Sequence, residues 1–116
     1  MKLSVLLIKP PYGDIQAAEA VRHAMGAIGD EIDVTLLLVD DGVYLAKKGQ
    51  DVAESGYTEL GESVSDLIDM GCSVLVEKNS MREAGLDTED IIENVKVVTG
   101  YEISETIKES DKTMIF

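Results

Sequence analysis

The chain opens with an apolar run, residues 3–8, that breaks at Pro10–Pro11 and leads into a helical pattern. A short, almost continuous apolar run is typical of a parallel strand buried on both faces. Asp14 can cap the helix that follows. The last residues, 112–116, form another strand-like run that ends with the chain. The opening therefore predicts a strand that delivers a loop and a helix N-terminus to one edge of a sheet.

Strand-like and helix-like segments alternate along the rest of the chain. Strands are predicted at residues 3–8, 33–39, 72–76, 95–98 and 112–116. Helices are predicted at residues 14–29, 43–48, 57–70, 87–94 and 102–109, with a loop at 49–56 and a loop or short helical turn at 78–85. The first helix is expected to bury Ala18, Val21, Met25 and Ile28 and to stop at Gly29. This alternation predicts one α/β domain, residues 1–116, built as a three-layer sandwich around a five-stranded, mostly parallel sheet.

The charge of the chain excludes several classes of partner. Ten basic and 23 acidic residues give a net charge of −13. No basic cluster is available for a nucleic-acid backbone or an anionic membrane surface. The single cysteine permits no internal disulfide and no cysteine-based zinc cluster. Because no signal peptide or membrane-spanning run is recognised, we expect a cytoplasmic protein without nucleic-acid or membrane partners.

Ligands of open α/β sheets bind beyond the carboxyl ends of the strands. In this chain the rule selects residues 9–14, 40–44, 77–82 and 99–101. The first of these loops has neither a P-loop nor a G-x-G-x-x-G pattern, so nucleotide binding by those routes is not supported. The helix N-terminus behind Gly13 nevertheless offers free N–H groups, and Tyr12 offers a flat wall for a small ligand or a partner's side chain.

Four other features carry side chains that could take part in chemistry. Cys72 begins a strand at the amino-terminal edge of the sheet, where packing is the better interpretation than nucleophilic catalysis. His23 lies within a helix and has no G-x-S-x-G partner motif. The Asp40–Asp41 pair could bind Mg²⁺, but acidic residues at strand ends are more often solvated or capping. Lys47–Lys48 is the densest positive spot and is either solvated or part of the pocket.

The order of short motifs resembles that of the DsrE/DsrF-like sulfur-relay family. The motifs, in chain order, are Pro11-Tyr12-Gly13, Asp41-Gly42-Val43, Gly49-Gln50, Met70-Gly71, Arg82-Glu83-Ala84-Gly85-Leu86 and Asp111-Lys112 with Phe116. The resemblance spans essentially the whole chain. It implies a cytoplasmic α/β sandwich that assembles into trimers or hexamers. In active members, it further implies that a cysteine on the loop after the third strand receives and passes on a persulfide.

This sequence departs from the family pattern at the sulfur-carrying position. Counting back from Arg82 places the family's cysteine at or next to Glu77, and a second cysteine of some members near Ser80. Neither residue is a thiol, and Cys72 lies five residues before Glu77, roughly 16 Å along an extended strand. Cysteine-free members of the family look like partner subunits.

We therefore predict a non-catalytic, oligomeric subunit or small-ligand binder connected with sulfur transfer, with no bound cofactor and no metal. Its partners would be further copies of itself or related subunits. Two alternatives stay open: a sulfurtransferase that uses Cys72 or a partner's thiol, and a binding module for a flavin, a nucleotide or another small molecule. The predicted pocket residues are Pro11, Tyr12, Gly13, Asp41, Tyr44, Glu77 and Ser80.

Overall fold

The computed structural model describes residues 1–50 and 60–116, and the predicted α/β architecture is confirmed. Its strands are β1 (Lys2–Leu7), β2 (Asp33–Leu38), β3 (Ser73–Glu77), β4 (Lys96–Val98) and β5 (Lys112–Ile115). Its helices are α1 (Gln16–Gly29), α2 (Leu60–Asp69), α3 (Lys78–Glu83) and α4 (Gly100–Glu109), with 3-10 turns η1 (Asp40–Ala46) and η2 (Thr88–Asp90). No helix in the described ranges is long and apolar enough to cross a membrane.

The strands form one sheet in the order β4-β3-β2-β1-β5, and every neighbouring pair is parallel. Leu7 pairs with Leu38, and Leu38 pairs with Val76, so the carboxyl ends of β1, β2 and β3 reach the same level. Their following loops therefore meet at one edge, which we call the carboxyl edge.

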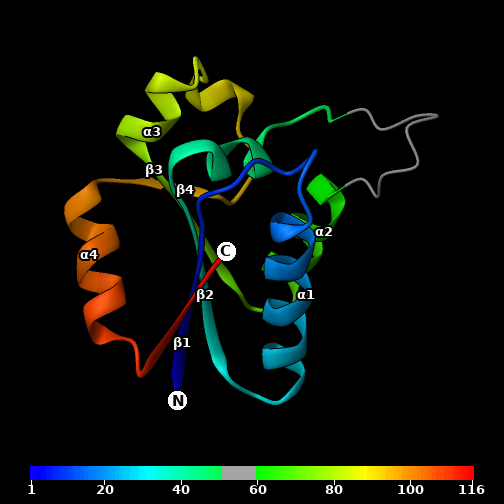
Figure 1. Cartoon of the computed structure of the whole chain (residues 1–116), viewed down its shortest axis with the longest axis vertical. Coiled ribbons are helices and arrows are strands. Elements are labelled where there is room, and N and C mark those ends of the chain that lie inside the picture. Colours follow the sequence, from blue (N-terminus) through cyan, green and yellow to red (C-terminus); the bar gives the residue numbers. More distant parts are fainter. Residues whose placement is uncertain (51–59) are drawn as a thin grey trace.

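The helices form layers on the two sides of the sheet. Figure 1 shows α1 and α2 together on one side and α4 on the other, with α3 close to the carboxyl edge. The chain terminus is held in the sheet, because the Phe116 amide donates to the Leu6 carbonyl at 2.8 Å and the Ile8 amide donates to the Phe116 carbonyl at 2.8 Å. This arrangement is the predicted sandwich.

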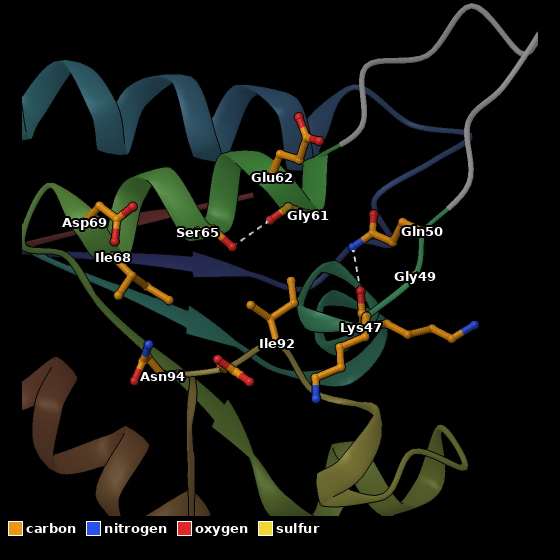
Figure 2. A pocket seen from close by; sticks show the side chains of 12 residues that line it. Lys47, Gly49, Gln50, Gly61, Glu62, Ser65, Ile68, Asp69, Ile92 and Asn94 are labelled. Atoms are coloured by element: carbon orange, nitrogen blue, oxygen red, sulfur yellow. Dashed lines mark hydrogen bonds between the residues drawn. The ribbon is translucent and has the colours of Figure 1, made fainter.

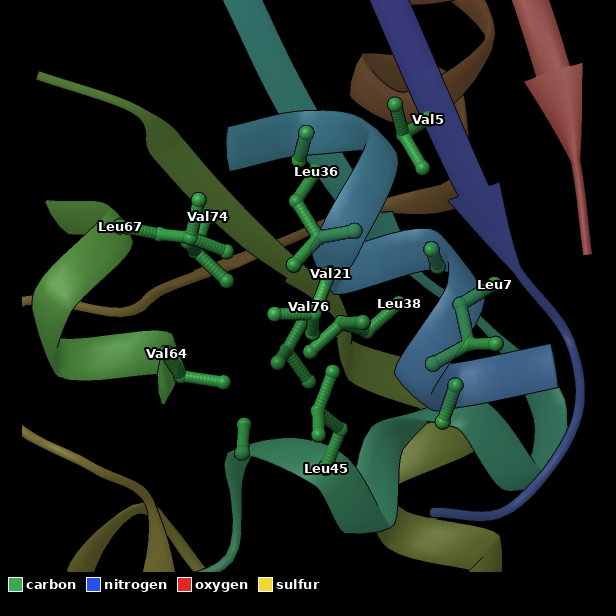
Figure 3. Packing of buried hydrophobic residues seen from close by; sticks show 14 of the residues in the cluster. Val5, Leu7, Val21, Leu36, Leu38, Leu45, Val64, Leu67, Val74 and Val76 are labelled. Carbon is green, nitrogen blue, oxygen red and sulfur yellow. The ribbon is translucent and has the colours of Figure 1, made fainter. Parts of the chain in front are cut away.

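The main core lies between the sheet and the α1–α2 layer (Figure 3). Alternate residues of the central strands point into it, among them Val5, Leu36 and Val74, which are buried almost completely. On the opposite side of the sheet, Leu37 of β2 and Ile103 of α4 are also buried. Burial of β2 on both faces explains the apolar run Leu36–Leu38 in its second half.

Two helix predictions require correction at α1. The most buried stripe consists of Ala17, Ala20, Val21 and Ala24, whereas Ala18 is exposed. Short alanine side chains allow the helix backbone to approach the sheet closely, so the stripe is centred one residue away from the predicted one. The helix also continues through Gly29 to an Asp30 cap, and the left-handed residue after it is Glu31, with φ of 63°.

The predicted helix at residues 87–94 is wrong in length. Only Thr88–Asp90 forms a 3-10 turn, and a reciprocal capping box joins Asp87 and Asp90. The helix cannot continue because Ile91 pairs with Lys47 in an antiparallel bridge and the Ile92 amide donates to the Ala46 carbonyl at 2.8 Å. The predicted loop 49–56 and the start of the helix predicted at 57–70 lie largely outside the described residues.

Candidate functional site

A tight turn at the end of β2 shapes the carboxyl edge. The Val39 amide donates to the Leu7 carbonyl at 3.1 Å, and Asp40 adopts a left-handed conformation with φ of 49°. Gly42 then passes so close to β1 that a Cβ at this position would lie 2.1 Å from the Leu7 carbonyl oxygen. Only glycine fits there, and this close approach directs η1 over the ends of β1 and β2.

The turn and α3 enclose a pocket of about 260 Å³, which we call the rim pocket. It is lined by Asp40, Asp41, Tyr44, Ser80, Glu83 and Ala84. Ser80 is buried, and its hydroxyl accepts a hydrogen bond from the Asp40 amide at 2.9 Å. The Tyr44 hydroxyl donates to the Ala84 carbonyl at 3.1 Å. These two bonds join η1 to α3, so the walls of the pocket are fixed to each other.

The chemistry of the rim pocket is acidic. Asp40, Asp41 and Glu83 contribute carboxylates, which accept hydrogen bonds and attract cations. Across residues 1–50 and 60–116, however, no group of three or more histidine, cysteine, aspartate or glutamate residues is placed to hold a metal ion. The Asp40–Asp41 pair, which the sequence offers as a less favoured candidate for Mg²⁺, therefore has no third ligand of these types among the described residues. The pocket is suited to a small hydrogen-bond donor rather than to a coordinated ion.

Tyr12 does not line the rim pocket. Its hydroxyl donates to Gln50 Oε1 at 2.7 Å and accepts from the Leu60 amide at 3.2 Å. Gln50 Nε2 in turn donates to the carbonyls of Leu45 and Lys47, at 2.8 and 3.0 Å. Tyr12 thus ties the loop after β1 to the end of η1 and the start of α2. Its neighbours Pro11, which is buried, and Gly13, with φ of 87°, shape this loop outside the pocket.

Glu77 ends β3 and faces α4 rather than the rim pocket. Its carboxylate carbon lies 3.9 Å from the point that a Cβ on Gly100 would occupy. Gly100 is the first residue of α4, whose N-terminus is capped by Thr99 through a 3.2 Å bond from the Glu102 amide. A carboxylate beside a helix N-terminus is favoured by the helix dipole. Of the seven predicted pocket residues, the structure brings together Asp41, Tyr44 and Ser80.

Cys72 lies at the opposite edge of the sheet, directly before β3. It is only 4% exposed, and its Sγ donates to the Ser73 carbonyl at 3.4 Å. Burial raises the pKa of the Cys72 thiol to about 11, with a smaller upward effect from Asp33 that is opposed by a hydrogen bond from the Leu36 backbone. The thiol is therefore protonated at neutral pH and is shielded from solvent, which is unfavourable for a nucleophile.

His23 has a local structural role. Its Nδ1 lies 2.7 Å from the Glu19 carbonyl oxygen, which can only accept, so Nδ1 carries the proton. Its ring packs against Phe116 with the ring centroids 5.3 Å apart. The histidine therefore connects α1 to the C-terminal residue.

A second pocket, which sequence reasoning missed, has a volume of about 470 Å³. It lies between α2 and residues 92–94 and extends to Lys47 and Lys48; we call it the α2 groove (Figure 2). The only signal for it in the sequence is the lysine pair, because Ile68 and Ile92 have the same pattern as ordinary core residues.

Comparison with known proteins gives a match over the whole chain. A family model described as the DsrE/DsrF-like family matches residues 1–116. The chain is 36% identical over 117 residues to the uncharacterized protein MJ0989 of Methanocaldococcus jannaschii, with both chains covered completely. It is 29% identical over 130 residues to the intracellular sulfur oxidation protein DsrF of Allochromatium vinosum, covering 99% of this chain and 96% of DsrF.

Solved structures agree with the sequence matches. The crystal structure of the ychN protein from E. coli superimposes with a TM-score of 0.88 at 25% identity, and each chain is covered completely. The protein MTH1491 of Methanobacterium thermoautotrophicum gives a TM-score of 0.77 at 15% identity, which supports the fold alone.

Proposed function

We propose a function from the premise that this chain belongs to the DsrE/DsrF-like family, which its DsrF relative links to sulfur metabolism. In this proposal the protein is a cytoplasmic, self-associating subunit or small-ligand binder that takes part in intracellular sulfur transfer without carrying a persulfide itself. Trimers or hexamers are the assemblies that the family resemblance implies.

The observation that carries the proposal is the separation of the only thiol from the carboxyl edge. A persulfide forms when a thiolate attacks the outer sulfur of a donor persulfide; a new S–S bond forms, the donor's S–S bond breaks, and the donor leaves as a thiolate. Cys72 is protonated, buried and at the other end of β3. The family resemblance puts the sulfur-carrying cysteine at or next to Glu77, and a carboxylate cannot accept sulfane sulfur.

In this proposal the carboxylate of Glu77 takes the place of the cysteine thiolate of active family members, so one anion replaces another. The N-terminus of α4 lies beside Glu77, and a helix N-terminus favours a nearby thiolate and a nearby carboxylate for the same reason. The negative charge of the family site is therefore kept while its sulfur chemistry is removed. This supports a retained structural or binding role for that edge.

Self-association is supported by apolar side chains left open on the surface. Ile15 and Tyr101 are each 72% exposed, and Ile115 on the edge strand β5 is 65% exposed. Sedimentation analysis tests this part: a trimer or hexamer is expected, and a strict monomer at micromolar concentration would contradict it.

The sulfur-transfer part is tested with glutathione persulfide and intact-mass measurement on the folded protein. We expect no adduct of one sulfur atom on the native chain and formation of the adduct on Cys72 after unfolding. A Cys72→Ala/Glu77→Cys variant serves as the positive control, because it places a thiol next to the α4 N-terminus. A stoichiometric, transferable adduct on Cys72 of the folded native protein would show that the chain is an active sulfurtransferase.

A further inference from the structure

The α2 groove has the size and lining of a ligand site that is separate from the rim pocket. Its volume of about 470 Å³ lies within the range of roughly 300–1,000 Å³ usual for small-molecule pockets. Ile68 and Ile92 line it and are each half-buried against the core, so they present an apolar floor. None of the lining residues belongs to the rim pocket.

Opposite charges occupy opposite ends of this groove. Figure 2 shows Lys47, Gly49 and Gln50 at one end and Ile68, Asp69 and Asn94 at the other, with Ile92 between them. Gly61 and Asp69 are eight residues apart on α2, which corresponds to about 12 Å along a helix. The groove is therefore an elongated apolar surface with a positive end and a negative end.

The charged residues at the two ends are available to a ligand. Within residues 1–50 and 60–116, neither lysine of the pair forms an ion pair, and neither does Asp69. Glu62 also lines the groove, but its carboxylate points toward α1 and away from Ile92 (Figure 2). Glu93 adds a further negative charge on the segment that carries Asn94.

From this arrangement we infer that the α2 groove binds an elongated zwitterionic small molecule. Its anionic group lies at Lys47 and Lys48, its apolar middle lies on Ile68 and Ile92, and its ammonium group lies at Asp69 with Glu93 nearby. A purely anionic ligand would leave the negative charge of Asp69 without an opposite charge. A purely cationic ligand would leave the positive charges of Lys47 and Lys48 without one. The inference concerns a different pocket from the rim pocket and does not depend on sulfur chemistry.

The test uses 8-aminooctanoate, whose ammonium and carboxylate are separated by a methylene chain of comparable length. Octanoate and octylamine are its matched controls, because each lacks one charged end. Binding is followed at low ionic strength through amide chemical shifts of residues 61–69 and 92–94. We expect saturable shifts with 8-aminooctanoate, and binding weaker by about 3- to 5-fold for each control ligand, as for one exposed ion pair.

Variants of the protein test which charged group of the ligand binds at which end of the α2 groove. Lys47→Ala/Lys48→Ala should weaken 8-aminooctanoate by about 3- to 5-fold and leave octylamine unchanged, whereas Asp69→Asn should weaken 8-aminooctanoate and leave octanoate unchanged. Lys108→Ala/Lys112→Ala removes the same charge from exposed positions outside the groove and should have no effect.

Two results would overturn the inference. One is the absence of saturable shifts in the groove at ligand concentrations on the order of 10 mM. The other is equal affinity for all three ligands, since this would mean that the charged ends are not recognised. The ligand comparison on the unmodified protein decides the matter even where a variant fails to fold. Either negative result leaves the sulfur-transfer proposal untouched, because that proposal is read out by persulfide mass.

Discussion

Gly42→Ala should be among the most destabilising single methyl additions in this protein. The new Cβ would lie 2.1 Å from the Leu7 carbonyl oxygen and 2.8 Å from its carbon, so η1 and β1 must separate by about 1 Å to reach the 3.0 Å that real Cβ contacts keep. The atoms in the way are backbone atoms, which no rotamer change can move. The same shift strains the Val39–Leu7 and Gly42–Val39 hydrogen bonds, of 3.1 and 2.9 Å.

Overpacking of a core costs about 1–3 kcal/mol, and each weakened hydrogen bond adds about 0.5–1.5 kcal/mol. We therefore expect the free energy of unfolding to fall by about 3 kcal/mol. With a urea m-value of about 2 kcal/mol/M, the unfolding midpoint should move down by about 1.5 M at fixed protein concentration.

Gly26→Ala is the matched control. This residue lies in α1, and an added Cβ meets nothing within 4 Å. The same methyl group should raise the free energy of unfolding there by up to about 1 kcal/mol, because alanine favours the helix more than glycine does. A Gly42→Ala midpoint equal to that of the unmodified protein, with an unchanged m-value, would refute the packing argument.

Three further predictions concern the loop, the last helix and the thiol. Tyr12→Phe should lower the free energy of unfolding by about 1–2 kcal/mol in urea, because the Leu60 amide and Gln50 lose their partner; an unfolding midpoint equal to that of the unmodified protein would contradict this. Thr99→Ala should cost about 1 kcal/mol in a circular-dichroism melt through loss of the α4 cap, and Thr99→Ser should retain most of the stability. The pKa of Cys72, raised by burial from 9.0 to about 11, favours the folded state below pH 9, and this contribution is lost as the pH rises to about 11. Urea unfolding from pH 8 to 11 should therefore show a decline of about 2–3 kcal/mol that Cys72→Ala lacks, and parallel curves would contradict the burial argument.

The strands could be predicted from the sequence because each is a short apolar run with turn residues on both sides. Their bounds in the structure differ from the predicted ones by at most one residue at either end. The strand order β4-β3-β2-β1-β5 could not be predicted, since apolar runs carry no information about which strand is the neighbour. The prediction of a helix at 87–94 was wrong in length. The capping box of Asp87 and Asp90 favours a helix start, but the pairing of Ile91 with Lys47 ends the helical turn after Asp90.

The site was predictable where it follows from sheet geometry alone. Asp41 and Ser80 meet because β2 and β3 are parallel neighbours whose carboxyl ends reach the same level. Tyr12 lies on the loop after β1, so sheet geometry also places it at the carboxyl edge. Its hydroxyl is hydrogen-bonded to Gln50 and to the Leu60 amide, and the side chain therefore lies outside the rim pocket. Side-chain direction of this kind depends on tertiary hydrogen bonds, which have no periodic pattern in the sequence.

The proposal of a non-catalytic family member depends on where β3 places the thiol. β3 pairs in parallel with both β2 and β4, and this pairing fixes the direction and register of the strand. Cys72 directly precedes β3, so it stays at the amino-terminal edge of the sheet whatever its ionisation state. Lowering the pKa of Cys72 would therefore not create a working site, because the thiol would still lie roughly 16 Å along the strand from the α4 N-terminus. A thiol at position 77 needs no such movement. If Cys72→Ala/Glu77→Cys forms a transferable persulfide while the unmodified chain does not, the loss of sulfur chemistry is due to one side chain at the carboxyl edge.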